Sequence, residues 1–216
     1  MASSSKIRGR CIAGISTSSG EWIRPVSGFQ EGELYPFHCR VNGRIPAPLD
    51  IVRFIYDRRL HDPAQPENVL IEDGPWDLIG ELKPDEAYDR LKESLDPGPE
   101  LFGNRGRSVS PAEAEAGMEA SLTLIEPDEI HFALKPPYYP GGRSKARVLL
   151  ELAGQEYDLP VTDFYVKPQL MTAGHGEHSQ GDVGLEPAMR TLVTASLGSA
   201  KYGAHWKLAA AFLSVD

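Results

Sequence analysis

Short apolar runs interrupted by proline and glycine constrain the fold of this chain most strongly. The 216 residues include 18 prolines and 21 glycines. Runs such as LDIVRFIY (Leu49–Tyr56) are almost continuously apolar and rich in β-branched residues, as expected of a strand in a barrel wall. Short strands that end at proline or glycine predict a mainly β protein with few helices, built as small barrels or sandwiches.

The N-terminal third is predicted to consist of strands. The first two form a hairpin around a Ser/Thr/Gly tip, and its second arm carries Trp22 and Arg24 two residues apart. These two side chains therefore share one strand face, while Ile23 points toward the core. The predicted segments are the hairpin Cys11–Ser27 and the strands Gly32–Val41, Leu49–Tyr56 and Glu67–Asp73.

The middle of the chain changes to helical patterns. Tyr88, Leu91 and Leu95 recur at helical spacing and predict a helix over Lys83–Leu95. A second helix is predicted over Ser110–Ala120, because Ser110 and Glu113 form a capping box with proline at the first helical position.

The last third returns to strands, so two small barrels are expected in tandem. Residues 1–80 are assigned to the first barrel, 81–120 to an acidic, partly helical connector and 121–216 to the second barrel. The final alanine-rich run is compatible with a helix, but its alternation favours a strand. The predicted strands are Ser121–Pro127, Glu129–Lys135, Ala146–Leu152, Glu156–Asp163, Leu192–Gly198 and His205–Ser214.

The charge of the chain limits its possible partners. The net charge is −9, which argues against non-specific binding of nucleic acid by the whole surface. Residues 1–60, however, hold nine Lys/Arg and five Asp/Glu, whereas residues 61–120 hold five and fifteen.

The chain has no apolar run of membrane-spanning length and no signal-peptide pattern, and Cys11 and Cys39 are expected to be reduced. We therefore expect a cytoplasmic protein with no membrane partner.

Several blocks follow one another along the chain: CIAGISTSSGEWIRPVS, LDIVRF, QPENVLIEDGPW, LFG, YDLPVTD and VTASLGSAKYGAHWKLAAAF. In this order they resemble the bacterial dual OB-fold domain family (DuOB). The resemblance implies two tandem OB-like barrels and nucleic-acid binding. It also implies a place in a bacterial defence, conflict or regulatory system with possible protein partners.

On such a barrel, aromatic rings stack on bases and basic groups meet phosphates. Trp22 is a candidate for stacking and Arg24 for phosphate contact. The alternative is that Trp22 packs under the connector helices and Arg24 pairs with an acidic residue of the middle segment.

Other polar residues in the matching blocks have similar alternatives. Gln65 and Asn68 can bond base edges or hold a turn, and Asp163 can bind nucleic acid or fix a loop. The remaining candidates for contact with nucleic acid are Ser196, His205 and Lys207 on the last two strands, and Arg105 and Arg107 on a predicted surface loop.

Catalytic motifs are absent from the sequence, and no cofactor is expected. The only metal candidates are His175 and His178 in a Gly-rich segment, Thr172–Gly184, for which a mobile solvated loop is favoured over a metal site. The sequence therefore predicts a non-catalytic nucleic-acid-binding module. The alternatives are a module that binds a nucleotide between the barrels or interacts with a protein, and, more remotely, a metal-dependent enzyme.

Overall fold

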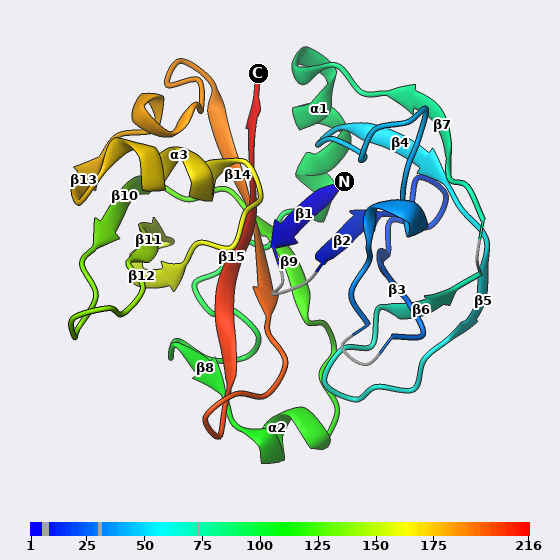
Figure 1. Ribbon diagram of the computed structural model, residues 1–216, viewed down its shortest axis with the longest axis horizontal. Coiled ribbons are helices and arrows are strands. Elements are labelled where there is room, and N and C mark those ends of the chain that lie inside the picture. Colours follow the sequence, from blue (N-terminus) through cyan, green and yellow to red (C-terminus); the bar gives the residue numbers. More distant parts are fainter. Residues whose placement is uncertain (6–8, 30–31, 73) are drawn as a thin grey trace.

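The computed structural model describes residues 1–5, 9–29, 32–72 and 74–216, and it is mainly β (Figure 1). The prediction of a mainly β fold with few helices is confirmed. None of the described helices has the length and apolarity needed to cross a membrane. The strands of the first half are β1 (Ala2–Ser5), β2 (Arg10–Ile15), β3 (Trp22–Val26), β4 (Asp50–Arg53), β5 (Tyr56–Arg59), β6 (Asn68–Ile71) and β7 (Asp77–Glu81).

Five strands of the first half form one sheet in the order β1-β2-β3-β6-β5. The first three are an antiparallel meander, β3 pairs in parallel with β6, and β6 pairs antiparallel with β5. Strands β4 and β7 form a separate antiparallel pair. The first core lies inside this set and contains Ile12, Leu34, Val41, Ile71 and Trp76.

The second half has two four-stranded sheets, which together repeat this strand order. Strands β10 (Glu129–Lys135), β11 (Lys145–Leu152) and β12 (Gln155–Pro160) form an antiparallel meander. Just after β12, Val161 bridges in parallel to Ala209 of β15 (His205–Val215), which pairs antiparallel with β14 (Arg190–Leu197). Both halves thus have a meander whose third strand meets the last strand in parallel, a similarity that the residues themselves do not reveal.

The second half also has its own core. Side chains from the meander, from β14 and β15, and from helix α3 (Val166–Ala173) pack together, with Phe132 and Phe212 in edge-to-face contact at 5.1 Å between ring centroids. Two such five-stranded units fit the OB-like architecture expected from the sequence, since an OB fold is a five-stranded, partly open barrel.

The connector does not stand apart from the barrels. Its short strand β8 (Ser108–Val109) pairs with β15, and the strand that follows the connector, β9 (Leu122–Ile125), pairs with β14. The helices here and elsewhere are short: α1 (Pro84–Leu91), α2 (Pro111–Glu115) and the 3₁₀ turns η1 (Pro36–His38), η2 (Lys92–Ser94) and η3 (Gly181–Val183).

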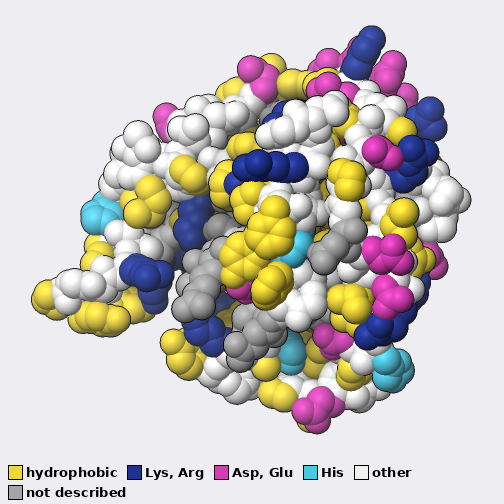
Figure 2. Space-filling view, turned by 45° about the vertical axis from the view of Figure 1, so that its right-hand side comes forward, with side chains coloured by type: hydrophobic (Ala, Val, Ile, Leu, Met, Phe, Trp, Pro, Cys, Tyr) yellow, Lys and Arg dark blue, Asp and Glu magenta, His cyan; other side chains and the backbone are white. Residues whose placement is uncertain are grey.

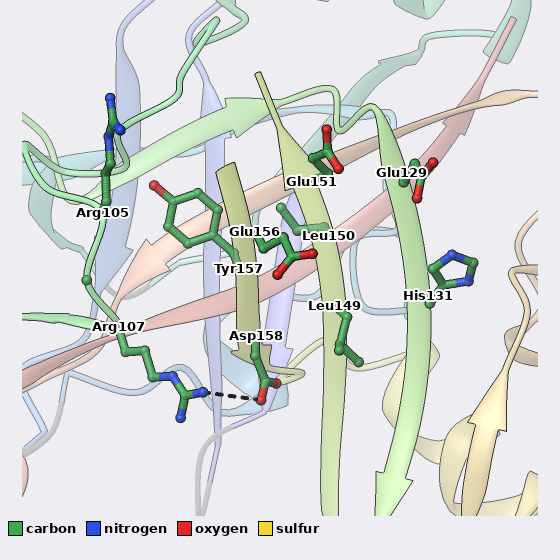
Figure 3. A pocket seen from close by; sticks show the side chains of 11 residues that line it. Arg105, Arg107, Glu129, His131, Leu149, Leu150, Glu151, Glu156, Tyr157 and Asp158 are labelled. Carbon is green, nitrogen blue, oxygen red and sulfur yellow. Dashed lines mark ion pairs between the residues drawn. The ribbon is translucent and has the colours of Figure 1, made fainter. Parts of the chain in front are cut away.

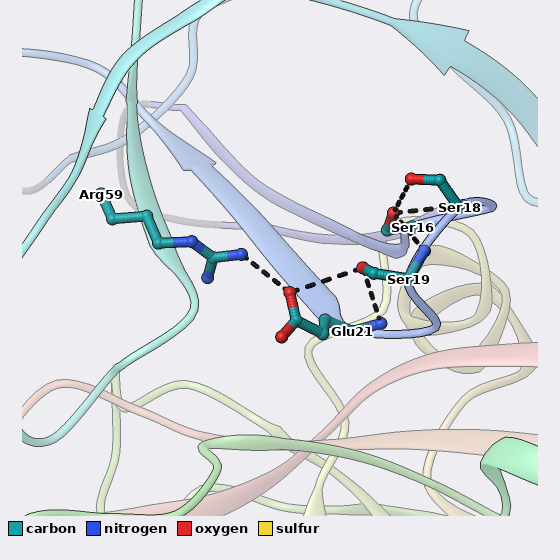
Figure 4. Close-up of polar contacts among 5 residues, drawn as sticks. All are labelled: Ser16, Ser18, Ser19, Glu21 and Arg59. Atoms are coloured by element: carbon teal, nitrogen blue, oxygen red, sulfur yellow. Dashed lines mark hydrogen bonds and ion pairs between the residues drawn. The ribbon is translucent and has the colours of Figure 1, made fainter.

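The predicted opening hairpin is present as β2 and β3, and polar contacts hold its tip (Figure 4). Ser16 Oγ accepts from the backbone N–H of Ser19 at 3.2 Å. Ser19 Oγ in turn donates to Glu21 Oε2 at 3.4 Å. Arg59 of β5 reaches the same carboxylate at 2.9 Å and ties the tip to the edge of the sheet. The Ser-rich tip is therefore a structural turn.

Two local predictions are wrong. Gly32–Val41 is not a strand: Leu34 makes only an isolated bridge to Arg10, and Pro36 opens the 3₁₀ turn η1. Thr172–Gly184 is not an unstructured loop, because it contains the end of α3, the strand β13 (Gly176–His178) and η3. Strand β13 pairs with β10, a long-range contact that the local sequence does not encode.

The final alanine-rich run is a strand, as predicted, but its alternation reverses midway. Thr194 of β14 pairs with Ala211, whereas the next residue, Ala195, pairs with Ala209. Ala210 is therefore the extra residue of a β-bulge, which changes the side that the following residues face. Before the bulge Lys207 is buried and Trp206 is partly exposed, and after it Phe212 is buried.

A buried polar network joins the two halves. Arg24 of β3 is only 2% exposed, and its Nη2 donates to Ser121 Oγ at 3.0 Å. The Ser121 hydroxyl donates to Glu67 Oε2 at 2.7 Å, and the backbone N–H groups of Ser121 and Leu122 donate to Glu67 Oε1. Both charged residues come from the first half and converge on the start of β9 in the second half.

Trp22, on the same side of β3, packs into an apolar cluster between the halves. Its neighbours there include Ala87 and Tyr88 of α1, and Leu192 and Val215 of the last two strands. The strand face that carries Trp22 and Arg24 is therefore the junction between the halves. The prediction that Arg24 faces solvent is wrong, because the second half covers that face.

We expect Arg24→Met to lower the free energy of unfolding by about 3 kcal/mol, since removing one member of a buried charged network leaves the other uncompensated. Urea unfolding measures this change. Arg53→Met is the matched control, because Arg53 lies in an exposed ion pair with Asp77. Equal stability of the two variants would contradict a structural role for Arg24.

Candidate functional site

A groove of about 400 Å³ lies on the second half, over the outer face of β10, β11 and β12 (Figure 3). The connector segment 105–107 forms its wall on the β12 side. The lining side chains come from these four segments and are Arg105, Arg107, Glu129, His131, Leu149, Leu150, Glu151, Glu156, Tyr157 and Asp158.

Strand register arranges the outer face in rows. Glu129, Glu151 and Glu156 are direct cross-strand partners and form an acidic row. The row two residues further along β10 holds His131, Leu149 and Asp158, so an apolar residue occupies its middle. Further on, Lys135 faces Lys145 across β10 and β11. The face therefore changes from acidic to basic along its strands.

Asp158 forms ion pairs with three basic side chains. Arg147 Nε lies 2.7 Å from its carboxylate, Lys135 Nζ 3.2 Å and Arg107 Nη2 3.7 Å. Burial opposes ionisation of Asp158, but the hydrogen bonds and charges of Arg147 and Lys135 outweigh burial and lower its pKa. The arginine of the wall is thus tied to the floor of the groove.

Two buried side chains hold the connector wall in place. The Tyr157 hydroxyl donates to the carbonyl of Pro99 at 2.6 Å and accepts from the N–H of Leu101 at 3.2 Å. Lys207 Nζ donates to the backbone oxygen of Asn104 at 2.6 Å and to its Oδ1 at 2.9 Å. These contacts fix the chain on which Arg105 and Arg107 stand, with side chains 60% and 69% exposed.

Lys207 is 0% exposed, so the prediction that it faces solvent as a phosphate contact is wrong. Among the described residues no carboxylate forms an ion pair with it. Burial lowers its pKa to about 8, against the weaker opposing charges of Glu100 and Glu113. Lys207 therefore holds the connector in place and does not reach the surface.

The loops at two ends of the second half carry exposed tyrosines beside lysines. Tyr138, between β10 and β11, is 86% exposed, with Lys145 Nζ 3.5 Å from its ring centroid. Tyr202, between β14 and β15, is 88% exposed, and Lys201 lies 5.2 Å from its ring. The sequence reasoning missed both tyrosines, although their Pro/Gly-rich surroundings mark them as loop residues.

The residues predicted from the QPEN block hold a turn. Asn68 is buried and its amide donates to Asp62 Oδ2 at 3.3 Å and to Gln65 Oε1 at 3.3 Å. Gln65 Nε2 donates to the carbonyl of Leu197 at 3.1 Å, across the junction. The structure thus gives both residues the turn role, one of the two roles that the sequence predicted for them.

Two other candidates, Asp163 and His205, are likewise engaged in internal contacts. Asp163 is buried and accepts from the N–H groups of Tyr165, Val166 and Phe212, although burial raises its pKa. His205 Nδ1 lies 3.0 Å from the carbonyl of Gly198 and is also buried.

Ser196 lies on the opposite side of its sheet from Lys207, because Leu208 is its cross-strand partner. Its Oγ lies 3.4 Å from Arg24 Nη2. Of the predicted contact residues, the structure brings only Arg105 and Arg107 together at an open groove, and their binding role stays a prediction.

The two candidate metal ligands, His175 and His178, contact different groups. His175 Nε2 contacts Ser144 Oγ at 2.9 Å, and His178 Nε2 contacts the carbonyl of Gly174 at 2.8 Å. Within the described ranges, no group of three His, Cys, Asp or Glu side chains is arranged to hold a metal ion.

Elsewhere on the surface, charges of both signs are mixed. On the face shown in Figure 2, basic side chains lie to the left of a central group of hydrophobic side chains, and acidic and basic side chains are mixed on its right. The exposed aromatics of the first half include Phe29 and Phe37, and Phe37 stacks on Tyr35 with 5.7 Å between ring centroids. Binding of a polyanion on this molecule therefore needs a local site.

The comparisons with known proteins identify one family. The family model described as "Dual OB-containing domain" matches residues 1–212. No curated protein and no solved structure gives a significant match.

We expect the stability of the wild type to rise relative to Lys207→Met between about pH 8 and about pH 10.4, the ordinary lysine pKa. In this window the unfolded chain keeps a proton that the folded protein has lost, so unfolding becomes less favourable as pH rises. Urea unfolding of both proteins at several pH values measures the difference. A constant difference would show that Lys207 does not titrate in this window.

Proposed function

Because the chain belongs to the dual OB-containing domain family, we propose that it is a non-catalytic nucleic-acid-binding module whose binding face is the groove on the second half. The observation that carries the proposal is the groove itself, where two exposed arginines stand beside the open face of β10, β11 and β12.

The position of the groove agrees with the way OB folds bind oligonucleotides. They use the face of the second and third strands and the loops that follow the first and fourth. In the second half these strands are β11 and β12, and both line the groove. The corresponding loops carry Tyr138 and Tyr202, rings on which unpaired bases can stack.

In the part of the first half that the structure describes, there is no equivalent open face. Its second and third strands are β2 and β3, and the side of β3 that carries Trp22 and Arg24 is buried against the second half. We therefore propose one nucleic-acid site per chain, made of the second half and the connector. The first half supports that site.

A single-stranded or locally unpaired ligand suits this face best. Stacking on exposed tyrosines and on Leu149 requires bases that are free of a partner strand. The family resemblance further supports a role within a bacterial defence or regulatory assembly. The exposed aromatics Phe29 and Phe37 are the surface that we assign to a protein partner in such an assembly.

A mononucleotide is the second candidate ligand, because the groove volume of about 400 Å³ is within the range of small-molecule sites. The site would then be the groove and not the junction, where the cavity beside Arg24 measures only about 20 Å³. A competition experiment distinguishes the two ligands. If the site binds a mononucleotide, the mononucleotide displaces a labelled oligonucleotide at a concentration close to that at which the unlabelled oligonucleotide displaces it.

We expect the double variant Arg105→Ala/Arg107→Ala to bind single-stranded DNA and RNA more weakly and with less dependence on salt. Losing two phosphate contacts reduces the slope of log affinity against log salt by about 1.4. Fluorescence anisotropy with labelled 12-mers over a salt titration measures both quantities.

The matched control is Arg58→Ala/Arg59→Ala, which removes two exposed arginines from β5 of the first half. We expect this variant to retain the wild-type slope. An equal loss in both variants would mean that the arginines act only through net charge, and no binding by the wild type at low salt would overturn the proposed function.

A further inference from the structure

The groove contains a feature that phosphate binding does not explain. Glu129, Glu151 and Glu156 stand side by side on three neighbouring strands, and like charges placed directly opposite one another destabilise a sheet. No ion pair among the described residues involves any of the three. A row of carboxylates also repels phosphates, so its effect on a phosphate is opposite to that of the arginine wall in the same groove.

The arrangement of the groove resolves this conflict. The connector with Arg105 and Arg107 adjoins β12, and the acidic row runs from β12 to β10 (Figure 3). Leu149, in the neighbouring row of β11, is 40% exposed and supplies an apolar floor. A nucleotide laid across such a groove can place its phosphate at the arginines, its ring on the leucine and its base edge toward the carboxylates.

We propose that the acidic row reads base edges and selects cytosine over thymine or uracil, an inference that rests on the proposed function. A carboxylate only accepts hydrogen bonds, and the cytosine N4 amino group donates them. Thymine and uracil present the O4 acceptor at the same position, which a carboxylate repels. Glu151, at the centre of the row and half-buried, is the specificity-determining residue.

The experiment compares labelled dC12 and dT12, two pyrimidine oligonucleotides that differ mainly in this base edge. We expect the wild type to bind dC12 about tenfold more tightly, the factor given by one good base-edge contact. Glu151→Gln brings the ratio close to one, because an amide can also donate to O4. Anisotropy at one fixed salt concentration measures each affinity.

Two further variants separate recognition from charge and from folding. Glu115→Gln removes one negative charge from α2, outside the groove, and keeps the tenfold ratio. Glu156→Gln, in the same row, reduces the ratio in the manner of Glu151→Gln. The melting temperature of Glu151→Gln stays equal to or above that of the wild type, because the change relieves like-charge repulsion.

The outcomes distinguish this inference from the function on which it rests. If neither oligonucleotide binds, the proposed function fails. If the wild type binds both with equal affinity, or dT12 more tightly, the protein binds nucleic acid but the acidic row does not select cytosine. If Glu151→Gln keeps the tenfold ratio, the acidic row does not recognise the base edge.

Discussion

The contact of Arg24 and Glu67 with Ser121 is the interaction on which the architecture depends. Two charged side chains of the first half meet the backbone and hydroxyl of one residue at the start of β9, where almost no water reaches them. Such groups are costly to bury unless their hydrogen bonds are made, so the relative placement of the halves is specified by geometry as well as by apolar contact. The packing of Trp22 and α1 beside this network adds the apolar part of the junction.

This junction also decides which half keeps an open sheet face. Both halves have the same strand order, but the second half covers the face of β3 in the first. The corresponding face of β10, β11 and β12 stays open and acquires the connector as a wall. Lys207 and Tyr157 complete that arrangement from below, because each bonds backbone oxygens or N–H groups of the connector. The open groove is thus a consequence of how three segments meet.

Much of the fold follows from local sequence, whereas the site depends on long-range contacts. Periodicity correctly places Trp22 and Arg24 on one side of a strand, and His205 and Lys207 on one side of another. It does not indicate whether that side meets water or a second barrel, since a partner surface is not encoded within the strand itself. The bulge at Ala210 and the pairing of β13 with β10 were unpredictable for the same reason. Arg105 and Arg107 could be identified as surface residues, but the acidic row appears only when strand register aligns three distant glutamates.

The close union of the halves affects how the molecule responds to force. Strand β1 contacts the second half through the hydrogen bond from Phe164 N–H to Ser3, and Arg10 of β2 lies over the Phe164 ring at 3.5 Å. Together with the buried junction, these contacts oppose independent movement of the barrels. OB modules on a flexible tether can pivot to follow a strand. Here we expect the two halves to unfold as one cooperative unit, and the groove to keep its shape.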